Sequence, residues 1–245
     1  MKFQSILLFV LFLISVSPAS ATNFYVGINA GILQQEGTFS VIDDTLNPSV
    51  NIDRPKHYDL PDGSDLTYSL YAGYKLASDL FLEVGFASNA EIQGEVRAQP
   101  PFVDPDPNAP VFADRAALED YETDYVYVAF VGIWPVQNNW AFSARLGFSI
   151  WNIDYTQYSS DIPTTGLPTR EELTTDLSAN LNDVLVSRLS DNTSALLLGF
   201  GVSYALDQNI EFKLSLESHL ADFSFTNLEL DYDAASLTLG AAYHF

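Results

Sequence analysis

The sequence contains no cysteine, which excludes a disulfide-stapled scaffold and any metal site built on thiolates. Basic residues are also scarce: 10 lysines and arginines stand against 32 aspartates and glutamates, for a formal net charge of -22. Nucleic acids are bound through basic contacts to their phosphates, so the sequence predicts no nucleic-acid partner. The same charge argues against tight binding to anionic lipid headgroups.

Beyond the N-terminus, no stretch is apolar for long enough to form a membrane-spanning helix, which needs about 20 residues. The N-terminus carries Lys2, an apolar run over residues 6–16 and a small-residue site that ends at Ala21. This three-part pattern is typical of a secretory signal peptide with cleavage after Ala21. We therefore expect residues 1–21 to be a signal peptide and residues 22–245 to form one mature domain.

The most informative segment is the C-terminal one, residues 232–245. Counting back from Phe245, every second residue is apolar or aromatic, whereas the residues between them are polar or small. A period of two indicates a β-strand with one apolar face. Chain ends usually fray, so a chain that ends inside such a strand has an unusual terminus.

Seven further segments show the same alternation. The eight predicted strands cover residues 23–33 (or, with a continuation that stays open, 23–40), 64–76, 80–97, 121–134, 140–155, 193–206, 210–222 and 232–245. The fourth segment is apolar on both faces, so its inward face stays open. Eight alternating segments in succession, most of them ten or more residues long, are typical of a β-barrel.

The predicted connections differ in length from one side to the other. Residues 77–79, 135–139 and 207–209 form short turns rich in Asp, Asn and Pro. The other connections are longer and cover residues 41–63, 98–120, 157–192 and 223–231. Short turns on one side and long loops on the other are typical of a transmembrane barrel whose long loops are extracellular. Both chain ends are then expected on the periplasmic side.

Three short motifs carry a family resemblance. They are Tyr71-Ala72-Gly73-Tyr74, Gly199-Phe200-Gly201-Val202-Ser203-Tyr204 and the terminal Tyr243-His244-Phe245. With the strand pattern, they resemble the small eight-stranded outer-membrane barrels of Gram-negative bacteria, such as the OmpA transmembrane domain and the OmpX and OmpW types. The resemblance implies an all-β, eight-stranded antiparallel up-and-down transmembrane β-barrel in the outer membrane, with long extracellular loops and short periplasmic turns. It also implies that Tyr243 and Phe245 are an insertion signal for the barrel-assembly machinery, and that lipid and lipopolysaccharide surround the barrel.

Charged residues recur on the predicted inner faces of the strands. They are Lys75, Glu83, Arg145, Glu211, Lys213 and Glu217. Eight strands leave an interior just wide enough for side chains to fill, and an unpaired buried charge is costly. We therefore expect these residues to form a neutralising ionic network that fills the lumen. The alternative is a selectivity cluster in a narrow channel for small or hydrophobic solutes.

Catalytic candidates are few, because the chain has only three histidines. Some eight-stranded barrels modify lipids with serine, histidine and carboxylate groups, and His219 shares a strand face with Ser215 and Glu217. His57 has no obvious nucleophile nearby, and His244 is expected at the periplasmic rim. Since a Ser-His-acid site needs convergence that spacing alone does not provide, we expect no enzyme activity. A lipid-modifying enzyme is the third hypothesis. No motif indicates a cofactor or a metal site.

The long loops are acidic, which favours a solvated surface able to meet extracellular partners. The third long loop also contains a helix signal over residues 170–188. Thr169 and Glu172 have the spacing of a capping box, and apolar residues follow at helical intervals. The sequence therefore predicts a structural or surface-interaction barrel that acts through its acidic loops.

Overall fold

The computed structural model of the protein describes most of the predicted mature domain. The described residues are 23–41, 57–59, 63–99, 115–161, 167–174, 185–225 and 228–245. The predicted signal peptide, residues 1–21, lies outside them. No helix in the described ranges is long and apolar enough to cross a membrane.

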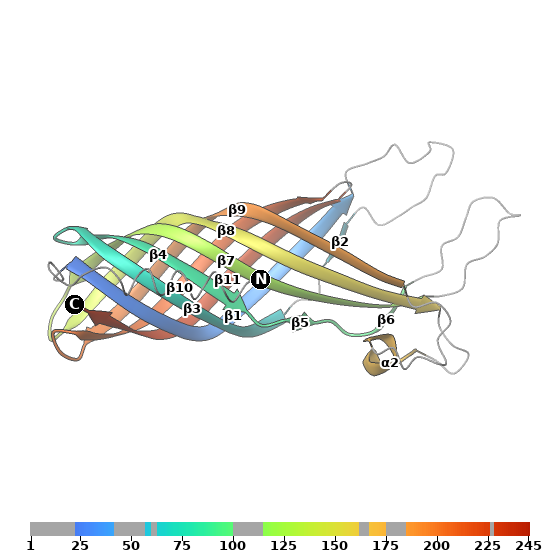
Figure 1. Ribbon diagram of the computed structural model, residues 1–245, viewed down its shortest axis with the longest axis horizontal. Helices are drawn as coiled ribbons and strands as arrows, with labels where there is room; N and C mark the ends of the chain where they lie inside the picture. Colours follow the sequence, from blue (N-terminus) through green and yellow to red (C-terminus); the bar gives the residue numbers. More distant parts are fainter. Residues whose placement is uncertain are drawn as a thin grey trace, which may run out of the picture.

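Eight long strands form one closed antiparallel sheet (Figure 1). They are β1 (Phe24–Val41), β3 (Gly63–Ala77), β4 (Leu80–Asn89), β7 (Arg115–Pro135), β8 (Trp140–Asp161), β9 (Leu185–Ala205), β10 (Ile210–Phe225) and β11 (Leu228–His244). Each pairs with the long strand that precedes it in the chain, and β11 pairs with β1 to close the ring. The predicted all-β, eight-stranded up-and-down barrel is therefore confirmed.

The closing seam joins the two ends of the described chain. β1 pairs with β11 without a register shift from Tyr25 to Val41. Just beyond the strands, the backbone N–H of Phe245 donates to the carbonyl of Phe24 at 3.0 Å. The strand predicted from the C-terminal alternation thus pairs on both sides, with β1 and with β10.

Side chains alternate between the lumen and the outer surface along the long strands. Outward residues are mostly apolar and exposed, for example Ile28 at 62%, Phe148 at 65% and Leu239 at 65%. This alternation places the predicted apolar faces on the outside of the barrel. In β7, where both faces are apolar, Tyr125 and Tyr127 point inward and are buried.

The two ends of the barrel differ in construction. Three tight connections, residues 78–79, 136–139 and 206–209, lie at the same end as the C-terminus (Figure 1, left), which we call the proximal end. In the second connection, Asn138 and Asn139 have positive φ angles of 51° and 69°, which asparagine adopts more readily than most residues. The opposite end is called the distal end.

At the distal end the strands extend further than the sequence pattern predicts. β7 begins at Arg115, β8 ends at Asp161 and β9 begins at Leu185, all within segments predicted to be loops. Only residues 226–227 separate β10 from β11, so the loop predicted over residues 223–231 is wrong in its extent. Continuous pairing of β8 with both neighbours outweighs the polar composition of these segments.

Three short strands complete the sheet: β2 (His57–Asp59), β5 (Ile92–Gln93) and β6 (Arg97–Gln99). β2 pairs with β1, and β5 and β6 continue the line of β4 along β7. The strand predicted over residues 80–97 is therefore broken after Asn89. Between β5 and β6, the backbone N–H of Gly94 donates to the carbonyl of Glu119 on β7 at 2.9 Å, so the interrupted segment stays attached to the sheet.

The predicted helix over residues 170–188 begins as predicted with α2 (Arg170–Thr174), and residues 175–184 lie outside the described ranges. Residues 185–188 belong to β9 and pair with β8, because strand pairing there outweighs the helical spacing of apolar residues. The predicted capping box is confirmed. The backbone N–H of Thr169 donates to the Glu172 carboxylate at 2.7 Å, and the backbone N–H of Glu172 donates to the Thr169 hydroxyl oxygen at 3.3 Å.

One arginine anchors α2, which lies at the distal end in Figure 1, to the distal part of β7. The Arg170 guanidinium donates two hydrogen bonds to the Asp120 carboxylate, at 2.8 and 2.7 Å, and a third to the Gly94 carbonyl at 3.2 Å. Leu173 of the helix is 2% exposed. A bidentate arginine pair fixes orientation as well as distance, so α2 is held in one position against the sheet.

Candidate functional site

The centre of the lumen is occupied by Arg145, which projects inward from β8. Its guanidinium forms ion pairs with Glu83 on β4 and Glu217 on β10. The distance from Arg145 Nη2 to Glu83 Oε1 is 2.6 Å, and Nη1 donates a hydrogen bond to Glu217 Oε1. The three side chains are only 8%, 0% and 5% exposed, in that order. Neither partner comes from a strand next to β8, so both ion pairs cross the lumen.

Two tyrosines complete the surroundings of the Glu83 carboxylate. The hydroxyl of Tyr25 donates to Oε2 at 2.7 Å, and the hydroxyl of Tyr127 donates to Oε1 at 2.8 Å. The Arg145 guanidinium carbon also lies 5.4 Å from the centroid of the Tyr127 ring. A buried carboxylate with one cation and two hydroxyl donors is well compensated, so this cluster can remain ionised inside the lumen.

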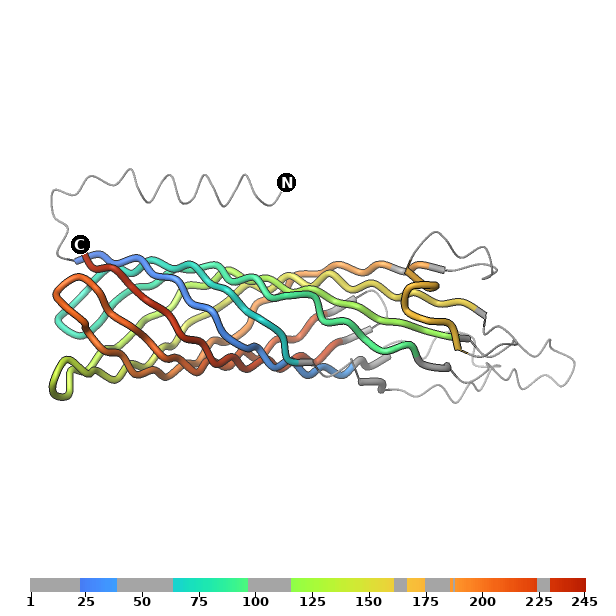
Figure 2. Tube along the Cα trace, turned by 90° about the horizontal axis from the view of Figure 1, so that it is seen from below, coloured from blue at the N-terminus to red at the C-terminus, as the bar shows by residue number. Residues whose placement is uncertain are grey.

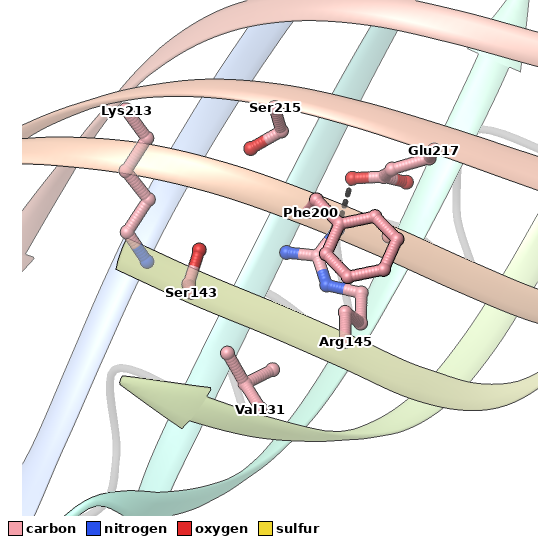
Figure 3. Close-up of a pocket in the computed structure, with 8 residues that line it drawn as sticks. Val131, Ser143, Arg145, Phe200, Lys213, Ser215 and Glu217 are labelled. Atoms are coloured by element: carbon pink, nitrogen blue, oxygen red, sulfur yellow. Dashed lines mark hydrogen bonds and ion pairs between the residues drawn. The ribbon is translucent and has the colours of Figure 1, made fainter. Parts of the chain in front are cut away.

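A small cavity lies beside this cluster (Figure 3). It is lined by Val131, Ser143, Arg145, Gly199, Phe200, Lys213, Ser215 and Glu217. The dashed line in Figure 3 marks the bond from Arg145 to Glu217 along one side of the cavity. The space open to the centre of a water molecule is about 10 Å³, which is near the lower limit for holding one water.

A second group of charges lies nearer the proximal end. Nζ of Lys213 lies 4.5 Å from the centroid of the Tyr25 ring and 5.3 Å from that of Tyr71. Glu211, two residues earlier on β10, has its carboxylate 2.6 Å from Nε2 of His244. His244 thus links the last strand to β10 inside the lumen rim, close to where the sequence pattern predicts it.

The six predicted network residues therefore separate into groups. Glu83, Arg145 and Glu217 form one connected cluster, whereas Glu211 and Lys213 lie along β10 toward the proximal end. Lys75, near the proximal end of β3, is half-buried, and its side chain forms no ion pair or hydrogen bond with another residue of the described ranges. The lumen thus contains an ionic cluster smaller than the predicted network.

Above this cluster, toward the distal end, apolar and aromatic side chains fill the lumen. This aromatic layer consists of Leu33, Tyr121, Tyr125, Trp151, Ile153, Leu197, Phe223, Leu230 and Tyr232. Its central ring, Trp151, stacks on Tyr125 with 4.3 Å between centroids and meets Tyr232 edge-on at 5.4 Å. Every member is at most 5% exposed, so these side chains have almost no contact with solvent.

The catalytic candidate His219 lies between the ionic cluster and the aromatic layer. Its Nδ1 is 3.1 Å from Oγ of Ser149, which also accepts a hydrogen bond from Trp151 Nε1 at 2.9 Å. The serine beside His219 is therefore Ser149 of β8, whereas the sequence pattern suggests Ser215. Nε2 of His219 is 4.0 Å from Oε2 of Glu217. Ser149 and His219 are both 0% exposed, so a lipid would reach them only by displacing the side chains packed around them.

The site predicted from the sequence did not include the tyrosine donors Tyr25 and Tyr127 or the aromatic layer. A usable signal exists in β7, because Tyr121, Tyr125 and Tyr127 share one parity and only one face of a strand can point inward. Among the described residues, no group of three or more His, Asp or Glu side chains is placed to hold a metal ion.

The sequence matches the model of the outer membrane protein beta-barrel domain over residues 6–245. The chain belongs to this family. It is therefore a transmembrane β-barrel of the Gram-negative outer membrane, and its outer surface fits that setting. On β8, exposed apolar side chains recur from Trp140 to Ile150. At about 3.4 Å per residue and a tilt of about 40°, this stretch makes an apolar band about 25 Å tall, as outer-membrane barrels have.

Solved structures of other outer-membrane proteins are similar to this barrel. Neisserial surface protein A is 14% identical, with a TM-score of 0.48 and coverage of 92% of this chain and 99% of that chain. Ail of Yersinia pestis, in complex with the heparin analogue sucrose octasulfate, is 14% identical, with a TM-score of 0.41 and coverage of 91% and 99%. The outer membrane protease OmpT from Escherichia coli is 11% identical, with a TM-score of 0.44 and coverage of 92% and 98%. No curated protein matches the sequence.

The predicted insertion signal lies on the outer surface of the barrel at the proximal end. Tyr243 and Phe245 are 46% and 47% exposed, and their ring centroids are 5.1 Å apart. The Phe245 ring also lies 5.7 Å from that of Phe24, on the strand that closes the seam. The two rings are thus available from the outside of the barrel, and their role in insertion stays a prediction.

Proposed function

We propose that this barrel is a closed scaffold that presents its distal strands to the cell exterior, with a structural or surface-interaction role. The proposal treats the lumen as a packed core and assigns recognition to the outside of the molecule. It includes no catalytic step, since Ser149 and His219, the serine and histidine in contact within the described ranges, are both fully buried.

The observation that supports this function best is the stacking of two closed levels in one lumen. At the first level, Arg145 joins Glu83 and Glu217 across the barrel, beside a cavity of about 10 Å³. At the second level, the aromatic layer around Trp151 is almost completely buried. A hydrated ion or a small solute would have to displace both levels, and a barrel of eight strands has little spare width for that.

The proposed orientation follows from the two ends of the barrel. The tight proximal turns and the C-terminus face the periplasm, and the distal strands and acidic loops face outward. Residues 1–21 would direct export and be removed after Ala21. Lipid and lipopolysaccharide would surround the apolar band, and the barrel-assembly machinery would read Tyr243 and Phe245. The distal strands and loops would contact extracellular surfaces.

Single-channel recording in planar bilayers tests the closed lumen. The purified barrel is compared with Arg145→Ala, which removes the central cation, and with Leu146→Ala, a matched change at the neighbouring lipid-facing position that is 54% exposed. We expect the wild type and Leu146→Ala to insert without conductance steps. Protease protection of the inserted barrel confirms that silence reflects a closed lumen and not failed insertion.

Reproducible wild-type steps that change in Arg145→Ala and not in Leu146→Ala would overturn the proposal. Such steps would show that ions pass through the lumen beside Arg145, and the narrow-channel hypothesis would take its place.

A further inference from the structure

The wall of the barrel divides at its distal end between β9 and β10. Pairing between these strands stops at Ala195 and Ala221. β9 continues with β8 alone as far as Leu185, and β10 continues with β11 alone as far as Phe225. Figures 1 and 2 both show β9 running on beyond the distal ends of β10 and β11.

The division leaves residues 185–194 of β9 with a partner on one side only. On the side away from β8, no strand of the described chain pairs with them. In an edge strand, alternate residues point both their N–H and their C=O outward, so about five of these ten residues present a donor and an acceptor. We call this row of backbone groups the β9 edge.

The β9 edge has two charged side chains, Arg188 and Asp191, but it lacks other features by which proteins usually protect a free strand. Residues 185–194 contain no proline and no lysine, and their register with β8 runs without a bulge. At the point of division, the Thr193 hydroxyl donates to the carbonyl of Asp222 on β10 at 2.6 Å. This bond closes the base of the division, and beyond it the β9 edge has no strand partner among the described residues.

Carboxylates surround the entrance to this edge. Asp191 lies on β9 itself, and across the division Asp222 of β10 stands directly opposite Asp231 of β11, with both side chains exposed. The whole chain carries a net charge of -22, which raises the local concentration of cations and of basic polypeptides. A second copy of this chain would bring the same negative charge to the edge and is disfavoured.

We propose that the β9 edge binds a basic, extended segment of another protein by strand addition. Backbone hydrogen bonds from residues 185–194 would supply the affinity, and the carboxylates on β9, β10 and β11 would select lysine and arginine side chains. The proposal rests on the proposed surface-interaction function and names its binding surface and partner class.

Amide hydrogen exchange tests this directly with the full mature barrel in lipid nanodiscs. The probe is a blocked peptide of alternating lysine and threonine. Its matched control has the same sequence with every backbone nitrogen methylated, so that it keeps the charge but cannot pair as a strand. We expect the first peptide to slow exchange at alternate amides of residues 185–194 at least about tenfold, and the second to leave them unchanged.

Charge selection is tested with two variants of the barrel. Asp222→Asn, beside the division, is expected to weaken peptide binding, whereas Asp79→Asn, in the proximal turn between β3 and β4, is expected to leave binding unchanged. Both residues are exposed, so neither substitution threatens the fold.

Three results would overturn the proposal. Unchanged exchange over the β9 edge at saturating peptide would exclude strand addition. Binding with protection elsewhere would exclude this edge while leaving the surface-interaction function intact. Protection that grows with barrel concentration in the absence of peptide would assign the edge to a second copy. Conductance steps from the wild-type barrel would contradict the closed lumen of the proposed function, and they are recorded in a separate experiment from the peptide binding.

Discussion

Replacing Arg145 with methionine removes the only cation of the central cluster while keeping much of the side-chain volume. The substitution leaves Glu83 and Glu217 buried, at 0% and 5% exposure, without their common partner. The two carboxylates are not equally affected. Glu83 keeps its hydroxyl donors, Tyr25 and Tyr127, at 2.7 and 2.8 Å, whereas Glu217 keeps only His219, at 4.0 Å.

The expected loss follows from this difference. Removing one partner of a buried ion pair costs about 3–5 kcal/mol of folding free energy. Because the tyrosines continue to compensate Glu83, most of the loss should come from Glu217, and we expect Arg145→Met to cost about 3–4 kcal/mol. Adding Glu217→Gln neutralises the stranded carboxylate, so the double variant should be more stable than Arg145→Met alone.

The free energies are measured by urea unfolding of the barrel folded in lipid vesicles, followed by far-ultraviolet circular dichroism. Leu146→Met is the matched control, because it changes the neighbouring outward residue and leaves the cluster intact. A loss below about 1 kcal/mol for Arg145→Met would refute the reasoning, because a loss that small is typical of an exposed pair. A double variant no more stable than Arg145→Met would show that Glu217 is not the stranded charge.

Three further predictions concern the wall and α2. Gly147→Val should abolish folding, seen as loss of the heat-modifiable band on electrophoresis, because even a Cβ at this position would lie 2.6 Å from a Cα of β7. Arg170→Gln should leave global stability within about 1 kcal/mol but speed proteolysis near α2, since it releases the partly exposed pair with Asp120. The backbone N–H and hydroxyl of Thr169 hold the pKa of Glu172 below its usual 4.5, so this cap contributes above that pH and is lost as pH falls through the lower value. The Thr169 amide resonance should therefore titrate below pH 4.5, and a midpoint at or above it would contradict the capping bond.

The barrel itself could be predicted because a period of two is clear in every long strand except β7. Lipid demands apolar residues on one face and the small lumen accepts polar or small ones on the other, so the pattern directly records the environment. The strand ends were harder to predict. Beyond the apolar band both faces of a strand meet water, and residues such as Asp191 and Asn192 then look like a loop although β9 pairs with β8 there.

The site could be predicted as a set of charges but not as a set of contacts. Arg145, Glu83 and Glu217 were recognisable from their inward parity. Their partnership was not, because each bond crosses the lumen between strands that are not neighbours, and the sequence pattern fixes only neighbours. The aromatic layer was missed because both faces of β7 are apolar, and the shared parity of Tyr121, Tyr125 and Tyr127 was the one signal that could have identified the inward face.

The three tryptophans of this chain occupy two separate environments. Trp134 and Trp140 are 52% and 49% exposed on the outer surface near the proximal end, whereas Trp151 is 0% exposed inside the aromatic layer. Brominated acyl chains should therefore quench the fluorescence of the first two by contact and spare the third. In variants that keep a single tryptophan, Trp134 or Trp140 would report insertion into lipid, and Trp151 would report whether water enters the lumen. The two signals are independent and need no added label.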